Sequence, residues 1–296
     1  MKNVACRLTT GVALTIGLSM STGALADGHM GSLPKSVWAI DDAHRLINVN
    51  PAMPAKIQSS VQVTGLEMGD KVIGIDFRVA YGDMYALADT GRIYIINQKT
   101  GKATLVPGSS PVAHMAMGPY GFDFNPAADK LRVVGDKNSN SRLHPETGAV
   151  VDFNGSTAGV QLDPKLAYSD EDPYAGELPD IVAAAYTYNP NDSKLTTNYA
   201  IDRRHGNLVM QGTKEGVTPS VSPNLGVLYT VGDLSLGSIR DASFDISDIS
   251  NVALAAVLSS QNSKTVLVEI DLESGRNHEL GVLGDGVHYT GFAIEP

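Results

Sequence analysis

The stretches GIDFRVAYGDMYALADTGRIYIINQKTGKATLV (residues 74–106) and GFDFNPAADKLRVVGDKNSNSRLHPETGAVVDF (residues 121–153) share one order of features, 47 residues apart. Each opens with Gly, an apolar residue, Asp and Phe. Each continues through a turn, an apolar segment, a polar hairpin tip and a Thr-Gly turn before a last apolar segment. A repeat of this length, built from short apolar segments, is typical of propeller and solenoid architectures.

The apolar segments alternate in the manner of strands. RIYIINQ (Arg92–Gln98) places Ile93 and Ile95 on one face and Tyr94 and Ile96 on the other, and KTVLVEIDL (residues 264–272) behaves in the same way. Segments of this kind, separated by Gly, Asn, Asp and Pro turns, indicate antiparallel sheets. Because both faces are largely apolar, we expect both faces of each sheet to be covered.

The opener of the repeat recurs three more times, as AAAYTY near Ala183, ASFDIS near Ala242 and TGFAI near Thr290. The last opener reaches the end of the chain without room for further strands, while residues 37–66 supply three strand-like segments with no opener. The sequence therefore predicts an all-β fold, a β-propeller of five four-stranded blades, in which Tyr289–Ile294 pairs with Val37–Asp41. Six blades or an open solenoid remain alternatives, because the third and fourth repeats are longer and less regular.

The first 26 residues have the pattern of a secretory signal peptide. Lys2 and Arg7 precede an apolar run at Gly11–Met20, and a small-x-small cleavage signal follows at Ala24–Ala26. The run is too short to span a membrane, so we expect cleavage after Ala26 and export to the periplasm or medium. Cys6 is the single cysteine of the chain and lies inside this segment, so the mature protein cannot form an internal disulfide.

The remainder, residues 27–296, is predicted to be one monomeric domain with an acidic insertion at about residues 155–180, expected as a surface loop. The chain has a formal charge of −10, and loss of Lys2 and Arg7 takes this to −12. A nucleic-acid partner is excluded by repulsion from the phosphate backbone. No segment of the mature sequence is apolar over the length of a membrane span.

The run GFDFNPAADKLRVV, with LHPETGAVV after it and VAAAYTYN further on, resembles a family of bacterial exported proteins known as domain of unknown function 4394. The resemblance covers nearly all of the mature chain. The sequence departs from the family pattern at Val79, where a proline is usual, and in the polar tip NSNSRLHPETG. The resemblance implies export and an all-β repeat fold, and it implies no activity.

The Asp of the opener recurs at Asp76, Asp123 and Asp245, while the third and fifth openers carry Tyr186 and Ala293 at the aligned places. In a propeller these strands are innermost. The carboxylates could each accept backbone N–H groups from a neighbouring blade, as buried Asp requires. They could instead converge in the channel and bind a hard cation such as Ca²⁺. A catalytic role as in glycoside hydrolysis is a third interpretation, but no Glu lies in an opening strand to serve as general acid.

Two further metal hypotheses arise elsewhere in the chain. Cleavage after Ala26 would create the terminus Asp27-Gly28-His29, whose amine, amides and imidazole form a square-planar Cu(II) site. The run AHMAMG (Ala113–Gly118) adds soft ligands for Cu(I). The acidic insertion could hold Ca²⁺ through Asp170 and Asp172, although its spacing matches no known calcium loop.

Taken together, these features favour an exported, non-enzymatic scaffold that binds a protein or glycan ligand. No cofactor is certain, and Ca²⁺ is the one candidate. The runner-up is an extracellular hydrolase that uses the channel carboxylates, and a periplasmic metal-binding protein is the second alternative. The sequence contains no nucleophile elbow, zinc-binding helix or phosphate-binding loop, so it assigns no catalytic residue.

Overall fold

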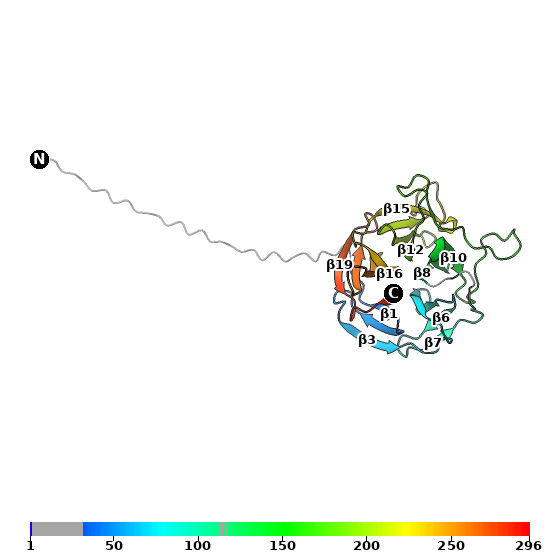
Figure 1. Cartoon of the computed structure of the whole chain (residues 1–296), viewed down its shortest axis with the longest axis horizontal. Helices are drawn as coiled ribbons and strands as arrows, with labels where there is room; N and C mark the ends of the chain where they lie inside the picture. Colours follow the sequence, from blue (N-terminus) through cyan, green and yellow to red (C-terminus); the bar gives the residue numbers. More distant parts are fainter. Residues whose placement is uncertain (2–31, 113–114, 116–117) are drawn as a thin grey trace.

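The computed structural model describes residues 1, 32–112, 115 and 118–296. Their strands form five small sheets around a central axis, and the carboxyl terminus lies close to that axis (Figure 1). The prediction of an all-β, five-bladed propeller is confirmed. The segment predicted to be a signal peptide, residues 1–26, falls outside the described part except for Met1.

We number the blades by their inner strands. Blade 1 consists of β4 (Val72–Arg78), β5 (Asp83–Ala88), β6 (Ile93–Ile96) and β7 (Ala103–Leu105). Blade 2 consists of β8 (Tyr120–Asn125), β9 (Lys130–Gly135) and β10 (Ser139–Leu143), with the short η1 (Asp136–Asn138) before the last. Blade 3 consists of β12 (Ile181–Tyr186), β13 (Asn198–Asp202), β14 (Asn207–Gln211) and β15 (Val227–Asp233), with β11 (Ala167–Tyr168) at its outer edge and η2 (Pro223–Leu225) before β15. Blade 4 consists of β16 (Ile239–Ile246), β17 (Ala253–Ser259), β18 (Val266–Ile270) and β19 (Asn277–Val282).

Blade 5 closes the ring with both ends of the chain. It consists of β20 (Tyr289–Ile294), β1 (Val37–Asp41), β2 (Arg45–Val49) and β3 (Ile57–Gln62), in that order across the sheet. The last strand pairs antiparallel with the first, Val37 opposite Ile294 and Ala39 opposite Phe292. The predicted pairing of Tyr289–Ile294 with Val37–Asp41 is therefore confirmed.

Two blades depart from the expected four strands. Blade 2 has three, because its fourth segment joins the sheet only through a bridge between Leu143 and Val150. The side chain of Asp152 then accepts the backbone N–H groups of Asn154 and Gln161, which turns the chain away from the sheet. Blade 3 gains a fifth strand, β11, which lies within the acidic insertion and pairs parallel with β15.

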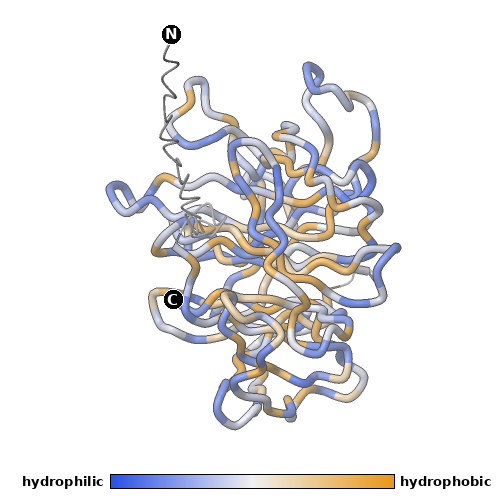
Figure 2. The backbone as a smooth tube through the Cα atoms, turned by 90° about the vertical axis from the view of Figure 1, so that its left-hand side faces the viewer, coloured by the Kyte–Doolittle hydropathy of each residue, from blue (hydrophilic) through white to orange (hydrophobic). Residues whose placement is uncertain are grey.

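The core lies between the blades rather than inside any one of them. Phe122 and Phe124 of β8 pack with Tyr85 and Leu87 of the preceding blade, and other inner strands pack in the same way. Near the axis the backbones approach closely, since a Cβ atom on Gly121 would lie only 2.6 Å from the backbone nitrogen of Ala184. Hydrophobic residues accordingly follow the strands, and hydrophilic ones gather at the loop ends (Figure 2).

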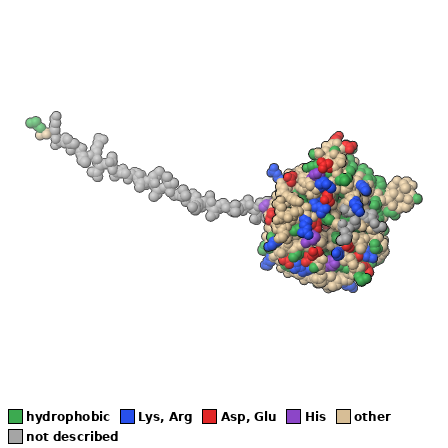
Figure 3. Space-filling view, viewed as in Figure 1, with side chains coloured by type: hydrophobic (Ala, Val, Ile, Leu, Met, Phe, Trp, Pro, Cys, Tyr) green, Lys and Arg blue, Asp and Glu red, His purple; other side chains and the backbone are tan. Residues whose placement is uncertain are grey.

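The face of the propeller seen in Figure 3 carries acidic and basic side chains interspersed, without a large patch of one sign. Mixed charges of this kind favour solubility over a single electrostatic partner. Within the described part of the chain, no helix has the length and apolar composition to cross a membrane.

Candidate functional site: an acidic cavity on the propeller axis

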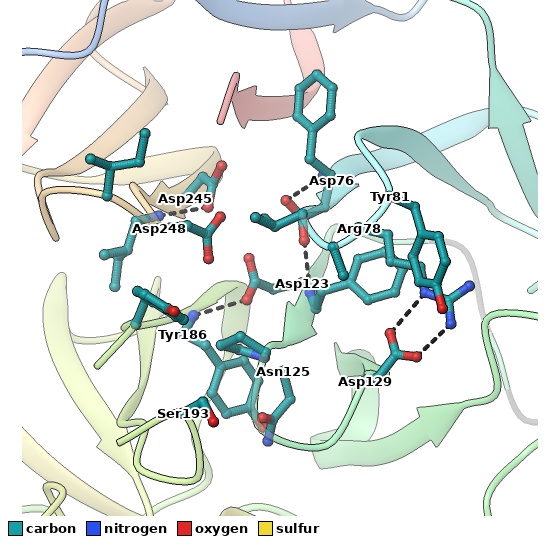
Figure 4. A pocket seen from close by; sticks show the side chains of 18 residues that line it. Asp76, Arg78, Tyr81, Asp123, Asn125, Asp129, Tyr186, Ser193, Asp245 and Asp248 are labelled. Atoms are coloured by element: carbon teal, nitrogen blue, oxygen red, sulfur yellow. Dashed lines mark hydrogen bonds and ion pairs between the residues drawn. The ribbon is translucent and has the colours of Figure 1, made fainter. Parts of the chain in front are cut away.

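Three inner strands bring Asp76, Asp123 and Asp245 together at the axis. Each offers a carboxylate oxygen within 4.8 Å of the oxygens of the other two, and their exposed fractions are only 4–6%. Figure 4 shows the three side chains pointing toward a common centre from different blades. Among the described residues this is the one group of three or more Asp, Glu, His or Cys side chains that could hold a metal ion.

The three carboxylates also connect neighbouring blades. Asp76 Oδ2 accepts the N–H of Phe124 at 2.7 Å, and Asp245 Oδ2 accepts the N–H of Ile294 at 2.6 Å. Asp123 Oδ2 accepts the N–H of Tyr186 at 2.9 Å. Each bond therefore runs from one inner strand to the next, which satisfies the need of a buried carboxylate for hydrogen-bond donors.

The three carboxylates differ in their second oxygen. Asp76 Oδ1 accepts the N–H of Phe77 at 2.7 Å, and Asp245 Oδ1 accepts the N–H of Ile246 at 2.6 Å. For Asp123 the described residues supply a single backbone donor, that of Tyr186, and its carboxyl also lies in hydrogen-bond contact with the carboxyl of Asp245. Asp123 is thus the member of the cluster with the fewest backbone donors.

The other two blades carry alanine at the equivalent place. The backbone donors to the three aspartates are Phe124, Tyr186 and Ile294. Phe124 is the fourth residue of its opener, so Tyr186 and Ile294 take the fourth place in theirs. The aligned third place in blade 3 is Ala185, so the sequence-based alignment of Tyr186 with the aspartates is wrong by one residue. Blade 5 carries Ala293 there, as expected.

A cavity of about 480 Å³ opens above the carboxylates. Its aromatic and aliphatic walls include Phe77, Tyr81, Phe124, Tyr188 and Ile249. Tyr81 and Ile249, with exposed fractions of 64% and 78%, lie at the solvent side. The volume is within the range of sites for small organic molecules, and an apolar wall with a few convergent polar groups is typical of such sites.

The wall of the cavity also contains one guanidinium, that of Arg78. Its Nε donates to Asp129 Oδ1 at 2.8 Å, its Nη2 pairs with Glu146, and it lies 4.2 Å from the centre of the Tyr81 ring. Since its charge is balanced by two carboxylates, it does not neutralise the aspartates on the axis.

A fourth carboxyl, Asp248, belongs to the same cavity. It follows Asp245 by three residues, in the turn after β16, and is half-buried. The sequence offered no repeat that would single it out, because no other opener has an Asp at this distance. Figure 4 places it beside Asp245 on the cavity side.

Burial and mutual repulsion perturb all four carboxyls. Burial, followed by the charges of neighbouring aspartates, raises the pKa of Asp76 and that of Asp123 well above the usual range. Burial and the charge of Asp248 raise the pKa of Asp245 to about 8, and burial raises the pKa of Asp248 to about 6. In the empty cavity near neutral pH, the cluster therefore holds protons that isolated aspartates would release.

These shifts predict that the free energy of unfolding falls as pH rises from about 5 to 8. The pKa of an unfolded Asp is about 3.9. Between that pH and the raised pKa of the folded protein, the native state binds more protons than the unfolded state. Raising the pH over this range therefore favours unfolding. His288, whose pKa is raised by Asp241, contributes with the same sign. Urea unfolding at each pH should show the slope, and Asp245→Asn should reduce it while the exposed Asp170→Asn should not. An unchanged slope in Asp245→Asn would contradict the assigned pKa.

Of the other predicted metal ligands, Asp27, His29 and His114 lie outside the described residues. In the acidic insertion, Asp172 accepts the backbone N–H and the hydroxyl of Thr230, so it serves a structural contact to blade 3. Asp170 is exposed.

Comparison with known proteins gives a family and no activity. No curated protein matches the chain. Among solved structures, a chain from the "Crystal structure of Nidogen/Laminin Complex" is similar over 88% of this chain and 98% of its own, with 9% identity and a TM-score of 0.46. A structural genomics protein of unknown function from Bacteroides thetaiotaomicron has 12% identity and a TM-score of 0.48 over 83% of this chain, which spans 55% of that protein. A protein from Lactobacillus plantarum has 13% identity and a TM-score of 0.37, covering 87% of this chain and 70% of its own. The family described as Domain of unknown function (DUF4394) matches residues 45–293, and the chain belongs to it.

Proposed function

We propose that the protein is a non-enzymatic binding protein whose ligand presents a positively charged centre to the axial cavity. The observation that carries this proposal is the acidic floor of Asp76, Asp123 and Asp245 beneath a cavity of about 480 Å³. The floor belongs to the rigid inner strands, so it needs no rearrangement to accept a ligand. Preorganisation of this kind limits the entropy lost on binding.

Electrostatics supports a cationic ligand. Carboxylates held this close repel one another when ionised, and the empty site avoids the repulsion by retaining protons. A cation on the axis would offset the repulsion without protonation. The aromatic rings of Tyr81 and Tyr188 line the cavity, and such rings attract organic ammonium groups through their π faces.

The proposal is tested by thermal unfolding at pH 7 and constant ionic strength, with tetramethylammonium and CaCl₂ as probes. A probe at a hundred times its dissociation constant should add about 2.7 kcal/mol to the free energy of unfolding. Asp123→Asn should weaken this stabilisation, because it removes one of the three axial carboxylates, the one with the fewest backbone donors. Asp170→Asn makes the same chemical change at an exposed site and should leave the stabilisation intact. Equal responses in the two variants would refute binding on the axis.

A bare divalent ion such as Ca²⁺ is the second candidate ligand, and it is favoured by the spacing of the carboxylate oxygens, all within 4.8 Å. Ca²⁺ takes six to eight oxygen ligands, so water in the cavity would complete its shell. Stabilisation by CaCl₂ and not by tetramethylammonium would favour the ion. The reverse result would favour an organic cation, which fits the cavity volume better.

An extracellular carbohydrate hydrolase remains the alternative, and Asp248 is the observation in its favour. A half-buried carboxyl with a pKa of about 6 suits a general acid. Against this, both oxygens of Asp76 and of Asp245 accept backbone N–H groups, which leaves Asp123 as the remaining carboxylate to act as base or nucleophile. Glycan hydrolysis that is abolished by Asp248→Asn would replace the binding proposal.

Export with cleavage after Ala26 forms part of the same proposal, and it rests on the amino-terminal sequence pattern alone. The terminal Cu(II) site of Asp27 and His29 depends on that cleavage. Amino-terminal sequencing of the protein recovered from the periplasm would test it, and a mature chain that begins elsewhere would remove the copper site.

A further inference from the structure

A second cavity, of about 100 Å³, lies beside the axial one and is lined by basic residues. Lys130, Arg132 and Arg142 face it, while Asn125 and Tyr186 form part of the walls of both cavities. The remaining wall residues are Ala128, Ser222, Pro223 and Asn224. Among the residues that the structure describes, no acidic side chain lines this cavity, in contrast to the axial one.

The positive charge is only partly balanced. Arg132 and Arg142 share one carboxylate, Asp163, at 2.7 Å from a guanidinium nitrogen of each. Lys130 lies near Asp129, whose carboxylate is already paired with Arg78. The three cations that line the cavity therefore have a local excess of positive charge, in a chain whose formal net charge is −10.

The guanidinium of Arg132 is held rigidly at the base of the cavity. Arg132 is 1% exposed, and its Nε donates to the Tyr186 hydroxyl at 3.1 Å. Its Nη1 donates to Asn140 Oδ1 at 2.7 Å, and its Nη2 to Asn224 Oδ1 at 2.5 Å. A guanidinium remains protonated at every physiological pH, so this charge is permanent.

The polar groups of the wall present donors rather than acceptors. Asn125 Oδ1 accepts the N–H groups of Ala127 and Ala128, and Asn224 Oδ1 accepts the Arg132 guanidinium. Because a carboxamide has one oxygen and one NH₂ group, these bonds leave the NH₂ group of each Asn as its free end. Ser222 Oγ accepts the N–H of Asn224, which leaves its hydroxyl hydrogen to donate.

We propose that this cavity binds a small oxyanion, such as the phosphate, sulfate or carboxylate group of a small molecule. Oxyanions are acceptors only, and charge-assisted hydrogen bonds from Lys and Arg are the strongest contacts available to them. The cations of this cavity are separate from the axial aspartates, so oxyanion binding here does not depend on a cation in the axial cavity.

The test is phosphate binding followed by ³¹P NMR and by thermal unfolding, with NaCl adjusted to keep the ionic strength constant. Binding should saturate. Within the described part of the chain, Lys130 Nζ donates to the carbonyls of Ala128 and Asp129 on its own hairpin, so Lys130→Gln should fold normally. We expect it to weaken binding roughly tenfold, the effect of losing one charged hydrogen bond. Lys194→Gln makes the same change at an exposed position outside the cavity and should bind as the wild type does.

Sulfate and acetate are then tested as competitors that displace bound phosphate. Displacement of phosphate by both would define a general oxyanion site, and displacement by sulfate alone would define a tetrahedral one. A rise in melting temperature that never saturates, or that is equal in Lys130→Gln and Lys194→Gln, would show a general salt effect and overturn the proposal.

Discussion

Deleting residues 289–296, so that the chain ends at His288, should lower the free energy of unfolding by at least about 5 kcal/mol. This is a large share of the 5–15 kcal/mol typical of a folded domain. The deletion removes β20, the inner strand of blade 5. Its Tyr289, Phe292 and Ile294 are 2–3% exposed, and burying a side chain of this size contributes about 1.5–3 kcal/mol. It also removes the N–H that Asp245 accepts from Ile294.

The measurement is thermal and urea unfolding of the truncated protein, with a chain lacking only Pro296 as the control. Pro296 is exposed and lies outside β20, so the control should lose little stability. Glu295 is kept in the control, because its backbone N–H donates to Ser36 O and its carboxylate accepts the indole N–H of Trp38. A melting temperature for the longer deletion within a few degrees of the full-length value would contradict the ring closure.

Replacing Arg132 by Met should lower the free energy of unfolding by about 3–5 kcal/mol, the usual effect of removing one partner from a buried charge network. Arg132 bonds to Tyr186 and Asn224 as well as to Asp163. The substitution keeps much of the apolar volume and leaves those partners without their donor. It also weakens the attachment of the acidic insertion, which contributes Asp163.

Arg240→Met provides the matched control, because Arg240 is exposed. Urea unfolding of both variants should show a large loss for Arg132→Met and a loss within about 0.5 kcal/mol for Arg240→Met, as for surface substitutions generally. A loss below about 1 kcal/mol for Arg132→Met would show that the network contributes specificity rather than stability.

The architecture could be predicted because each blade repeats a local pattern. Alternation in segments such as Arg92–Gln98 identifies the strands. The last opener has no strands after it, and the first three strands have no opener before them, which predicts that the two ends of the chain share one blade. The exceptions arise from contacts that no local pattern shows. The side chain of Asp152 ends blade 2 early by accepting backbone N–H groups of Asn154 and Gln161. The bond from the Tyr186 N–H to Asp123 places Ala185, and not Tyr186, in the third place of the blade 3 opener.

The candidate site could be predicted only in part. The repeated Asp pointed to the axis, since repeated positions in inner strands meet there. Asp248 lay outside the repeat, and its relevance depends on the cavity that the five blades form together. The ion pair between Arg132 and Asp163 joins residues 31 positions apart. In the sequence, Arg132 is one polar residue of an ordinary strand, so no local pattern identifies its partner.

In the function we propose, the axial carboxylates hold protons without a ligand and exchange them for a cationic one. Isothermal titration calorimetry at pH 7, in buffers of different ionisation enthalpy, measures that exchange directly with CaCl₂ and tetramethylammonium as probes. Binding should release protons, because ionised carboxylates are stabilised by the cation, and Asp123→Asn should reduce both affinity and proton release. Binding without proton release, or no binding of either probe that depends on Asp123, would contradict it.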